Sequence, residues 1–162
     1  WFGYVAITVC WLCIKDKEEG GKLVAFLIAG MTLFIVISAV FPNGLNLRPK
    51  TFSRDNIFID MVKHLYTIDT PTNILPSIHV YNTLCIYHAV KNSDLFKNRK
   101  IWRGFTSLLA WSIIASTVFL KQHSIIDVIL AFALELPMYM LLYKGVSFKL
   151  KTTKRKSQIE TL

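Results

Sequence analysis

The sequence predicts an all-α, polytopic transmembrane helical bundle with about five spans, and three observations support this prediction. Of the 162 residues, 53% are hydrophobic, and the mean hydropathy is +0.43. The charged residues gather between long apolar runs, whereas a soluble domain of this length covers a single core with mixed charge. The net charge is +9, and the Lys and Arg residues are divided unevenly between the connections on the two sides of the predicted bundle.

The spans are predicted in order near residues 1–14, 23–42, 76–90, 104–120 and 124–143. About 20 apolar residues in a helix cross about 30 Å of hydrocarbon. The opening run, 2–14, has only 13 residues and no initial methionine, so we expect a truncated N-terminus and a chain that continues upstream. We assign residues 1–145 to a membrane-embedded domain and 146–162 to a basic cytoplasmic tail.

Residues 43–75 form a predicted outer loop that is longer than a simple connection requires. Within it, Ile57, Met61, His64 and Leu65 fall at helical spacing, which predicts a short amphipathic helix over 56–66. Such a helix would lie on the membrane interface and shape access to a headgroup. A plain surface connector is the alternative.

The charge distribution predicts the orientation of the spans. Fourteen of the 19 Lys and Arg residues fall in 15–22, 91–103 and the segment from Lys144 onward, all on one side of an alternating bundle. The positive-inside rule places that side in the cytoplasm. Arg48, His79 and His123 then all lie on the opposite, extracytoplasmic side.

His123 and Asp127 suggest chemistry at the mouth of the last span. They are spaced i, i+4, so they would share a face on a helix that begins near His123. Asp127 accepting the imidazole N–H would orient the ring and leave its other nitrogen as a nucleophile. In the alternative reading, Asp127 is a first-turn carboxylate that the helix dipole favours.

The segment Pro76-Ser77-Ile78-His79 has the pattern of a helix start. Ser77 is a plausible cap, and the free N–H groups of a first turn favour a phosphate. His79 would stand beside that turn, placed to give a proton to a departing alkoxide. Arg48 could clamp phosphate oxygens, and Lys121 could add a second positive charge. A capped helix with an interfacial histidine, and an arginine against lipid headgroups, are the structural alternatives.

Together these motifs resemble the type 2 phosphatidic acid phosphatase superfamily of lipid phosphate phosphatases, in a divergent branch similar to the inositol phosphorylceramide synthases. The family pattern Pro-Ser-x-His is matched in full by 76–79. The third motif is matched in register by Ser116, His123 and Asp127, and Arg48-Pro49 matches the end of the first. The resemblance covers roughly residues 24–133.

The resemblance implies a role for each matched residue. His123 would be the nucleophile that forms a phosphohistidine, Asp127 would orient it, and His79 would be the general acid. The phosphate-binding residues would be Arg48, Ser77, Lys121 and Ser116. Two family cations are replaced, by Phe41 seven residues before Arg48 and by Thr117 after Ser116.

The predicted function is therefore hydrolysis of a lipid phosphomonoester or diphosphate by an integral membrane enzyme. Its partners would be a lipid phosphate and membrane lipids, with no nucleic acid, no metal and no cofactor, since the chain offers no carboxylate cluster for magnesium. Short loops favour a bacterial plasma membrane. The alternatives are a lipid phosphotransferase and a non-catalytic lipid-binding or transport protein. The sequence leaves open the lipid, the acceptor and the oligomeric state.

Overall fold

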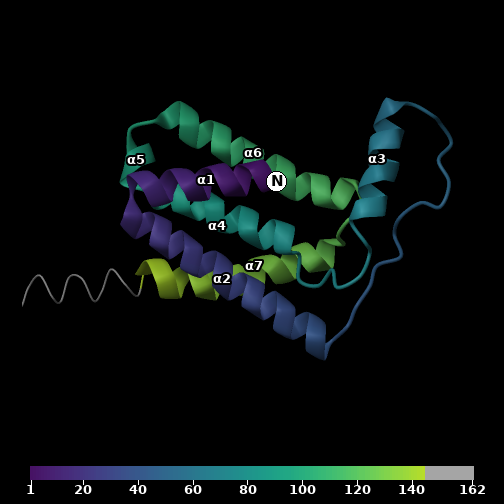
Figure 1. The fold of residues 1–162 in the computed structure, drawn as a ribbon, viewed down its shortest axis with the longest axis horizontal. Helices are drawn as coiled ribbons and strands as arrows, with labels where there is room; N and C mark the ends of the chain where they lie inside the picture. The colour runs from purple at the N-terminus through teal and green to yellow at the C-terminus, as the bar shows by residue number, and fades with distance from the viewer. Residues whose placement is uncertain (145–162) are drawn as a thin grey trace, which may run out of the picture.

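A computed structural model describes residues 1–144, and in that range the chain is helical without a named strand. This confirms the all-α prediction. The predicted tail, 146–162, lies outside the described residues. Figure 1 shows the helices, which are α1 (Phe2–Lys15), α2 (Lys17–Val40), α3 (Ile57–Ile68), α4 (Ile78–Asn92), α5 (Asp94–Lys97), α6 (Lys100–Phe119), α7 (Ile125–Tyr139) and the π-helical turn η1 (Met140–Lys144).

Helix α4 is the centre of the bundle, and α1, α2, α6 and α7 all pack against it. Nine of its 15 residues are buried, more than in any other described helix. Its core side chains include Val80, Leu84 and Ile86, while Asn82 and Thr83 are buried polar groups. The central position explains why this segment is less apolar than its neighbours, because its polar groups are buried against other helices.

Two glycines allow close helix packing. A Cβ at Gly20 would lie 2.7 Å from the backbone of Cys13, where α1 and α2 meet. A Cβ at Gly30 would overlap the ring of Tyr81, whose hydroxyl donates to the carbonyl of Phe26 at 3.3 Å. Small residues of this kind bring helix backbones together.

Among residues 1–144, two helical segments are long and apolar enough to cross a membrane: α2 and the continuous stretch Ile125–Tyr143. Only 17% of the tested window of each is buried in the bundle. Helix α2 begins at Lys17, six residues before the predicted span, because Asp16 caps it by accepting from the amide of Glu19 at 3.1 Å. The predicted spans at 1–14, 76–90 and 104–120 are helical, as α1, α4 and α6, but these helices are shorter or less apolar than a span by that measure.

The three cysteines differ in burial. Cys85 is buried in the core, but Cys10 and Cys13 are exposed on α1. The described part of the chain leaves both of these thiols on the outside of the bundle.

The predicted loop helix is confirmed as α3, which lies across one end of the bundle (Figure 1). Tyr66 ties it down by donating its hydroxyl to the carbonyl of Leu120, at the end of α6, at 2.9 Å. The two ends of the loop are joined by Asn43, whose side-chain oxygen accepts from the amides of Ile74 and Leu75. The loop therefore leaves and rejoins the bundle at one point, next to the start of α4.

Candidate functional site

The two motif histidines meet at the end of the bundle that α3 covers. His79 stands in the first turn of α4, and His123 lies in the turn between α6 and α7. Nδ1 of His79 is 3.1 Å from Nε2 of His123, within hydrogen-bond distance. Two segments 44 residues apart thus present imidazole groups to a single point.

The end of α6 fixes the backbone of His123. The carbonyl of Thr117 accepts from the amides of both Gln122 and His123, at 3.0 and 3.1 Å. To make this turn, Lys121 adopts a left-handed conformation with φ 53°. A left-handed residue after a helix end is usually Gly or Asn, so the lysine here carries a backbone cost.

Asp127 is held behind His123 by the start of α7. Ser124 and Asp127 form a capping box, in which an Asp127 carboxylate oxygen accepts from the amide of Ser124 at 2.6 Å. The same oxygen is 3.8 Å from Nδ1 of His123. That nitrogen is buried and makes no hydrogen bond within the described residues, so the predicted His123–Asp127 hydrogen bond is not formed. The reason is that α7 begins at Ile125, beyond His123, and its cap takes up the carboxylate.

The start of α4 positions His79. Ser77 caps this helix by accepting from the amide of Val80 at 3.3 Å, as predicted. The amide of Ser77 donates to the carbonyl of Asp127 at 3.3 Å, which joins the first turns of α4 and α7. Trp1 packs edge-on against the His79 ring, with centroids 4.6 Å apart.

The geometry indicates one arrangement of protons on the two rings. Nδ1 of His123 faces a carboxylate, which favours a proton on that nitrogen. In the neutral ring Nε2 is then the acceptor, so Nδ1 of His79 is the donor in the contact between the rings. Nε2 of His123 is thus the nitrogen with a lone pair.

Burial keeps His123 neutral. Its side chain is 5% exposed, and this burial, together with the charge of the nearby His79, lowers the pKa of His123 to about 4. Asp127 and Asp69 oppose the shift but do not reverse it. An imidazole with this pKa holds its lone pair at neutral pH, as a nucleophile must.

Arg48 is already paired. One guanidinium nitrogen lies 2.8 Å from a carboxylate oxygen of Asp69, and another donates to the backbone carbonyls of Tyr66 and Asp69. The guanidinium also stacks on the Tyr66 ring, 4.6 Å from its centroid. Arg48 is therefore fixed in place. Its guanidinium is already paired with Asp69, with which a bound phosphate would compete.

Asp69 and Gln122 are site residues that the sequence prediction missed. The side-chain amide of Gln122 donates to the Asp69 carboxylate at 3.0 Å, so Asp69 links Arg48 to the residue before His123. Asp69 acts electrostatically on both motif histidines. The one available signal was the position of Asp69 at the end of the predicted loop helix, where a carboxylate opposes the helix dipole and needs a cation.

The remaining predicted residues divide into those with other partners and those that are free to bind. The Ser116 hydroxyl donates to the carbonyl of Ile113 at 2.7 Å, within its own helix. Lys121 is exposed, with no ion pair among the described residues. Of the two replaced cations, Phe41 ends α2 with 63% exposure, and Thr117 is buried with its hydroxyl on Ile114.

The described residues contain no group of three or more His, Cys, Asp or Glu side chains that could hold a metal ion. A third histidine with a close polar neighbour, His88, lies away from the site, where its Nε2 is 3.2 Å from buried Glu135 of α7.

The site thus brings together two histidines, a carboxylate behind one of them, a fixed arginine and the first turn of a helix. Comparisons with family models, with characterised proteins and with solved structures find no match to this chain.

Proposed function

We propose that the chain is a polytopic membrane protein whose helices α1, α2, α4, α6 and α7 cross the bilayer, with the histidine end on the extracytoplasmic face. The bundle supports this placement because its flanks carry large exposed apolar side chains, such as Ile35 on α2, Leu108 on α6 and Ile129 on α7. Contiguous apolar surface of this kind marks contact with lipid or protein. The uneven Lys and Arg distribution sets the orientation, and a bacterial plasma membrane is the proposed location.

The proposed activity is metal-independent phosphoryl transfer from a lipid phosphate, most simply to water. A single observation carries it: Nε2 of His123 and Nδ1 of His79 meet at 3.1 Å, with Asp127 behind His123. Packing histidines have no need for this pairing, whereas nucleophilic catalysis with a general acid requires both groups at one phosphorus.

The chemistry proceeds in two displacements. Nε2 of His123 attacks phosphorus and forms a P–N bond as the P–O bond to the lipid breaks, and protonated His79 gives its proton to the departing alkoxide. Asp127 stabilises the positive charge that develops on the His123 ring. Water then attacks the phosphohistidine, His79 accepts its proton, and inorganic phosphate leaves with the P–N electron pair returned to Nε2.

The positive groups around the histidines would stabilise charge on the phosphate oxygens. Arg48 is held by backbone carbonyls close to the site, and Lys121 is exposed in the turn that carries His123. The first turn of α4 adds N–H groups, with Ser77 as its buried cap. Positioning and such charges supply most of the catalysis in phosphoryl transfer.

The test is phosphate release from a panel of lipid phosphates by the purified, detergent-solubilised chain in EDTA. We expect release that is lost by a factor of at least about a thousand in His123→Ala. His64→Ala is the matched control, because His64 is exposed on α3 and has no place in the site. Equal release by the unsubstituted chain and His123→Ala would contradict the proposal.

The same assay separates the alternatives. A second result is conversion of the lipid only when a lipid alcohol is added, without release of inorganic phosphate. That result would assign a phosphotransferase that uses the same histidines. Binding of lipid phosphate without any turnover would assign a non-catalytic binding or transport protein.

A further inference from the structure

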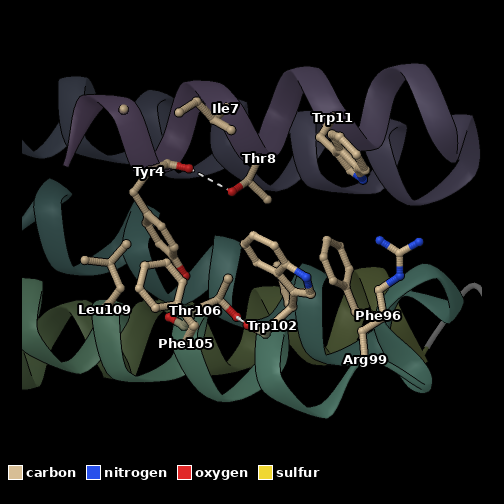
Figure 2. Close-up of a pocket in the computed structure, with 12 residues that line it drawn as sticks. Tyr4, Ile7, Thr8, Trp11, Phe96, Arg99, Trp102, Phe105, Thr106 and Leu109 are labelled. Carbon is tan, nitrogen blue, oxygen red and sulfur yellow. Dashed lines mark hydrogen bonds between the residues drawn. The ribbon is translucent and has the colours of Figure 1, made fainter.

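A second site is a groove between α1 and α6, lined along α1 from Gly3 to Trp11, with a volume of about 420 Å³. Figure 2 shows its two walls, with Ile7 and Trp11 from α1 and Trp102 and Phe105 from α6. Val90 of α4 contributes to its lining. The volume falls within the range of ligand pockets, and the lining is predominantly apolar.

The polar groups of the groove have partners inside the protein. The hydroxyl of Tyr4 crosses from α1 to the carbonyl of Thr106 on α6, at 3.3 Å. The hydroxyls of Thr8 and Thr106 donate to carbonyls of their own helices. A polar ligand would therefore gain little from these hydroxyls, whereas an apolar chain would meet walls made mainly of apolar and aromatic side chains.

Charge enters the groove at one end only. Arg99, the residue before α6, lines the end farthest from Tyr4, and Figure 2 shows its side chain pointing toward α1. It is exposed and has no ion pair among residues 1–144. Nearby Lys97 already pairs with Asp94 at 3.8 Å, so Arg99 is the unpaired charge that lines this end of the groove.

We propose that this groove binds one acyl chain of an anionic phospholipid, whose phosphate lies against Arg99. The helix directions support the assignment: α1 runs from the histidine end, where Trp1 contacts His79, to the end where Arg99 lies, which is the cytoplasmic leaflet in the proposed orientation. Trp11 and Trp102 line the groove as aromatic residues of a membrane interface do. A phosphate at Arg99 complements a charge that the protein leaves unpaired.

The inference rests on the proposed membrane placement and not on the proposed chemistry. Its readout involves no turnover, so a failure of lipid binding and a failure of phosphate release are distinguishable. The groove is also separate from the histidines, because neither His79 nor His123 is among its lining residues.

The experiment is quenching of Trp102 fluorescence in vesicles of brominated phosphatidylglycerol or brominated phosphatidylcholine, measured as the difference between the full chain and Trp102→Phe. We expect about a fivefold preference for phosphatidylglycerol, since one basic residue near the surface contributes about 1 kcal/mol. Arg99→Gln should abolish the preference. Lys97→Gln is the matched control, because Lys97 is two residues away and does not line the groove.

A second variant tests the acyl chain. A Cβ at Gly3, which lines the groove, meets nothing within 4 Å, so Gly3→Phe should fold and fill the groove. We expect it to lower quenching by both lipids. Equal quenching by both lipids that Arg99→Gln leaves unchanged would overturn the proposal. So would protection of Trp102 from both lipids in a chain that sediments as a dimer, because a second copy would then cover the groove. Lipid retained by the unsubstituted chain in native mass spectrometry checks the result without any substitution.

Discussion

Nδ1 of His79 lies 3.1 Å from Nε2 of His123, and the second of these nitrogens is the one that would attack phosphorus. The two rings satisfy each other when no substrate is bound. In the proposed reaction, a phosphate would enter between the rings, after which each ring could contact it. Because His123 is the proposed nucleophile and His79 the proposed general acid, substituting one or the other should affect activity differently.

His79→Gln should affect substrates according to their leaving group. A lipid alkoxide needs a proton as it departs, so its release should fall by about 10² to 10⁴. An aryl phosphate has an aryloxide leaving group that departs without a proton, so it should still phosphorylate His123 and give an acid-labile phosphoryl-protein. The measurement is phosphate release with both substrates, combined with trapping of the labelled chain. An equal loss for both substrates would show that His79 is not a general acid.

Asp69→Asn should strengthen the binding of inorganic phosphate by about tenfold, because one competing negative charge disappears from Arg48. Backbone carbonyls of Tyr66 and Asp69 still hold the guanidinium in that variant. Product inhibition constants give the measurement. Asp60→Asn, a carboxylate on α3 that pairs with Lys63, is the control and should change nothing. Weaker phosphate binding in Asp69→Asn would mean that Asp69 mainly positions Arg48.

Lys121→Asn separates charge from backbone. Asn tolerates the left-handed conformation that Lys121 adopts, so the free energy of unfolding should rise by up to about 1 kcal/mol. If Lys121 binds phosphate, KM should rise about fivefold with little change in kcat. Thermal unfolding and steady-state kinetics on one preparation measure both effects. Lys63→Gln on α3 is the charge-matched control, and a KM that moves equally in both variants would remove Lys121 from the site.

Stability should depend on the titration of His123. The folded pKa of about 4 lies below the unfolded value of about 6.5, so the unfolded chain binds a proton first as the pH falls. The contribution of neutral His123 to the free energy of unfolding is fully present above pH 6.5. It is lost as the pH falls toward 4, and the total loss is on the order of 3 kcal/mol. Unfolding measured across this range should show the loss, and His123→Gln should lack it. A histidine resonance that His123→Gln removes should titrate near pH 4; titration near 6.5 would contradict the burial argument.

The α1–α2 packing can be tested with neighbouring glycines. Gly20→Ala places a Cβ 2.7 Å from the Cys13 backbone, which cannot move aside, so we expect a loss of about 1–3 kcal/mol. In Gly21→Ala the added Cβ meets nothing within 4 Å, so helix propensity should raise the free energy of unfolding by up to about 1 kcal/mol. Unfolding in detergent compares the two variants directly, and an equal response would mean that the helices do not approach as closely as the structure has them.

Local signals in the sequence were sufficient for the helices and their caps. Apolar runs located the bundle helices, helical spacing located α3, and Ser77 was recognised as a cap from its place before an apolar segment. The contacts that hold the site together are of another kind. Asp69 reaches Arg48 across 21 residues and Gln122 across 53, and neither spacing has a local pattern.

The relation of His123 to Asp127 shows where periodicity misled. A spacing of four residues predicts a shared helix face, but Ser124 caps α7 and takes the carboxylate for its own amide. The competing cap was visible in the sequence as Ser124 three residues before Asp127. Nδ1 of His123 and the Asp127 carboxylate are therefore close, at 3.8 Å, but they do not form the hydrogen bond that a shared helix face predicted.

Asn43 gives the chain a property that bears on how such a site can change. Because one side-chain oxygen joins the beginning of the loop to the residues before α4, the stretch between them behaves as a closed ring attached at its neck. Residues on the exposed side of α3 can be exchanged, and the ring lengthened near Lys50, without shifting the register of His79. The exposed side of α3 and the histidines of the bundle can therefore vary independently.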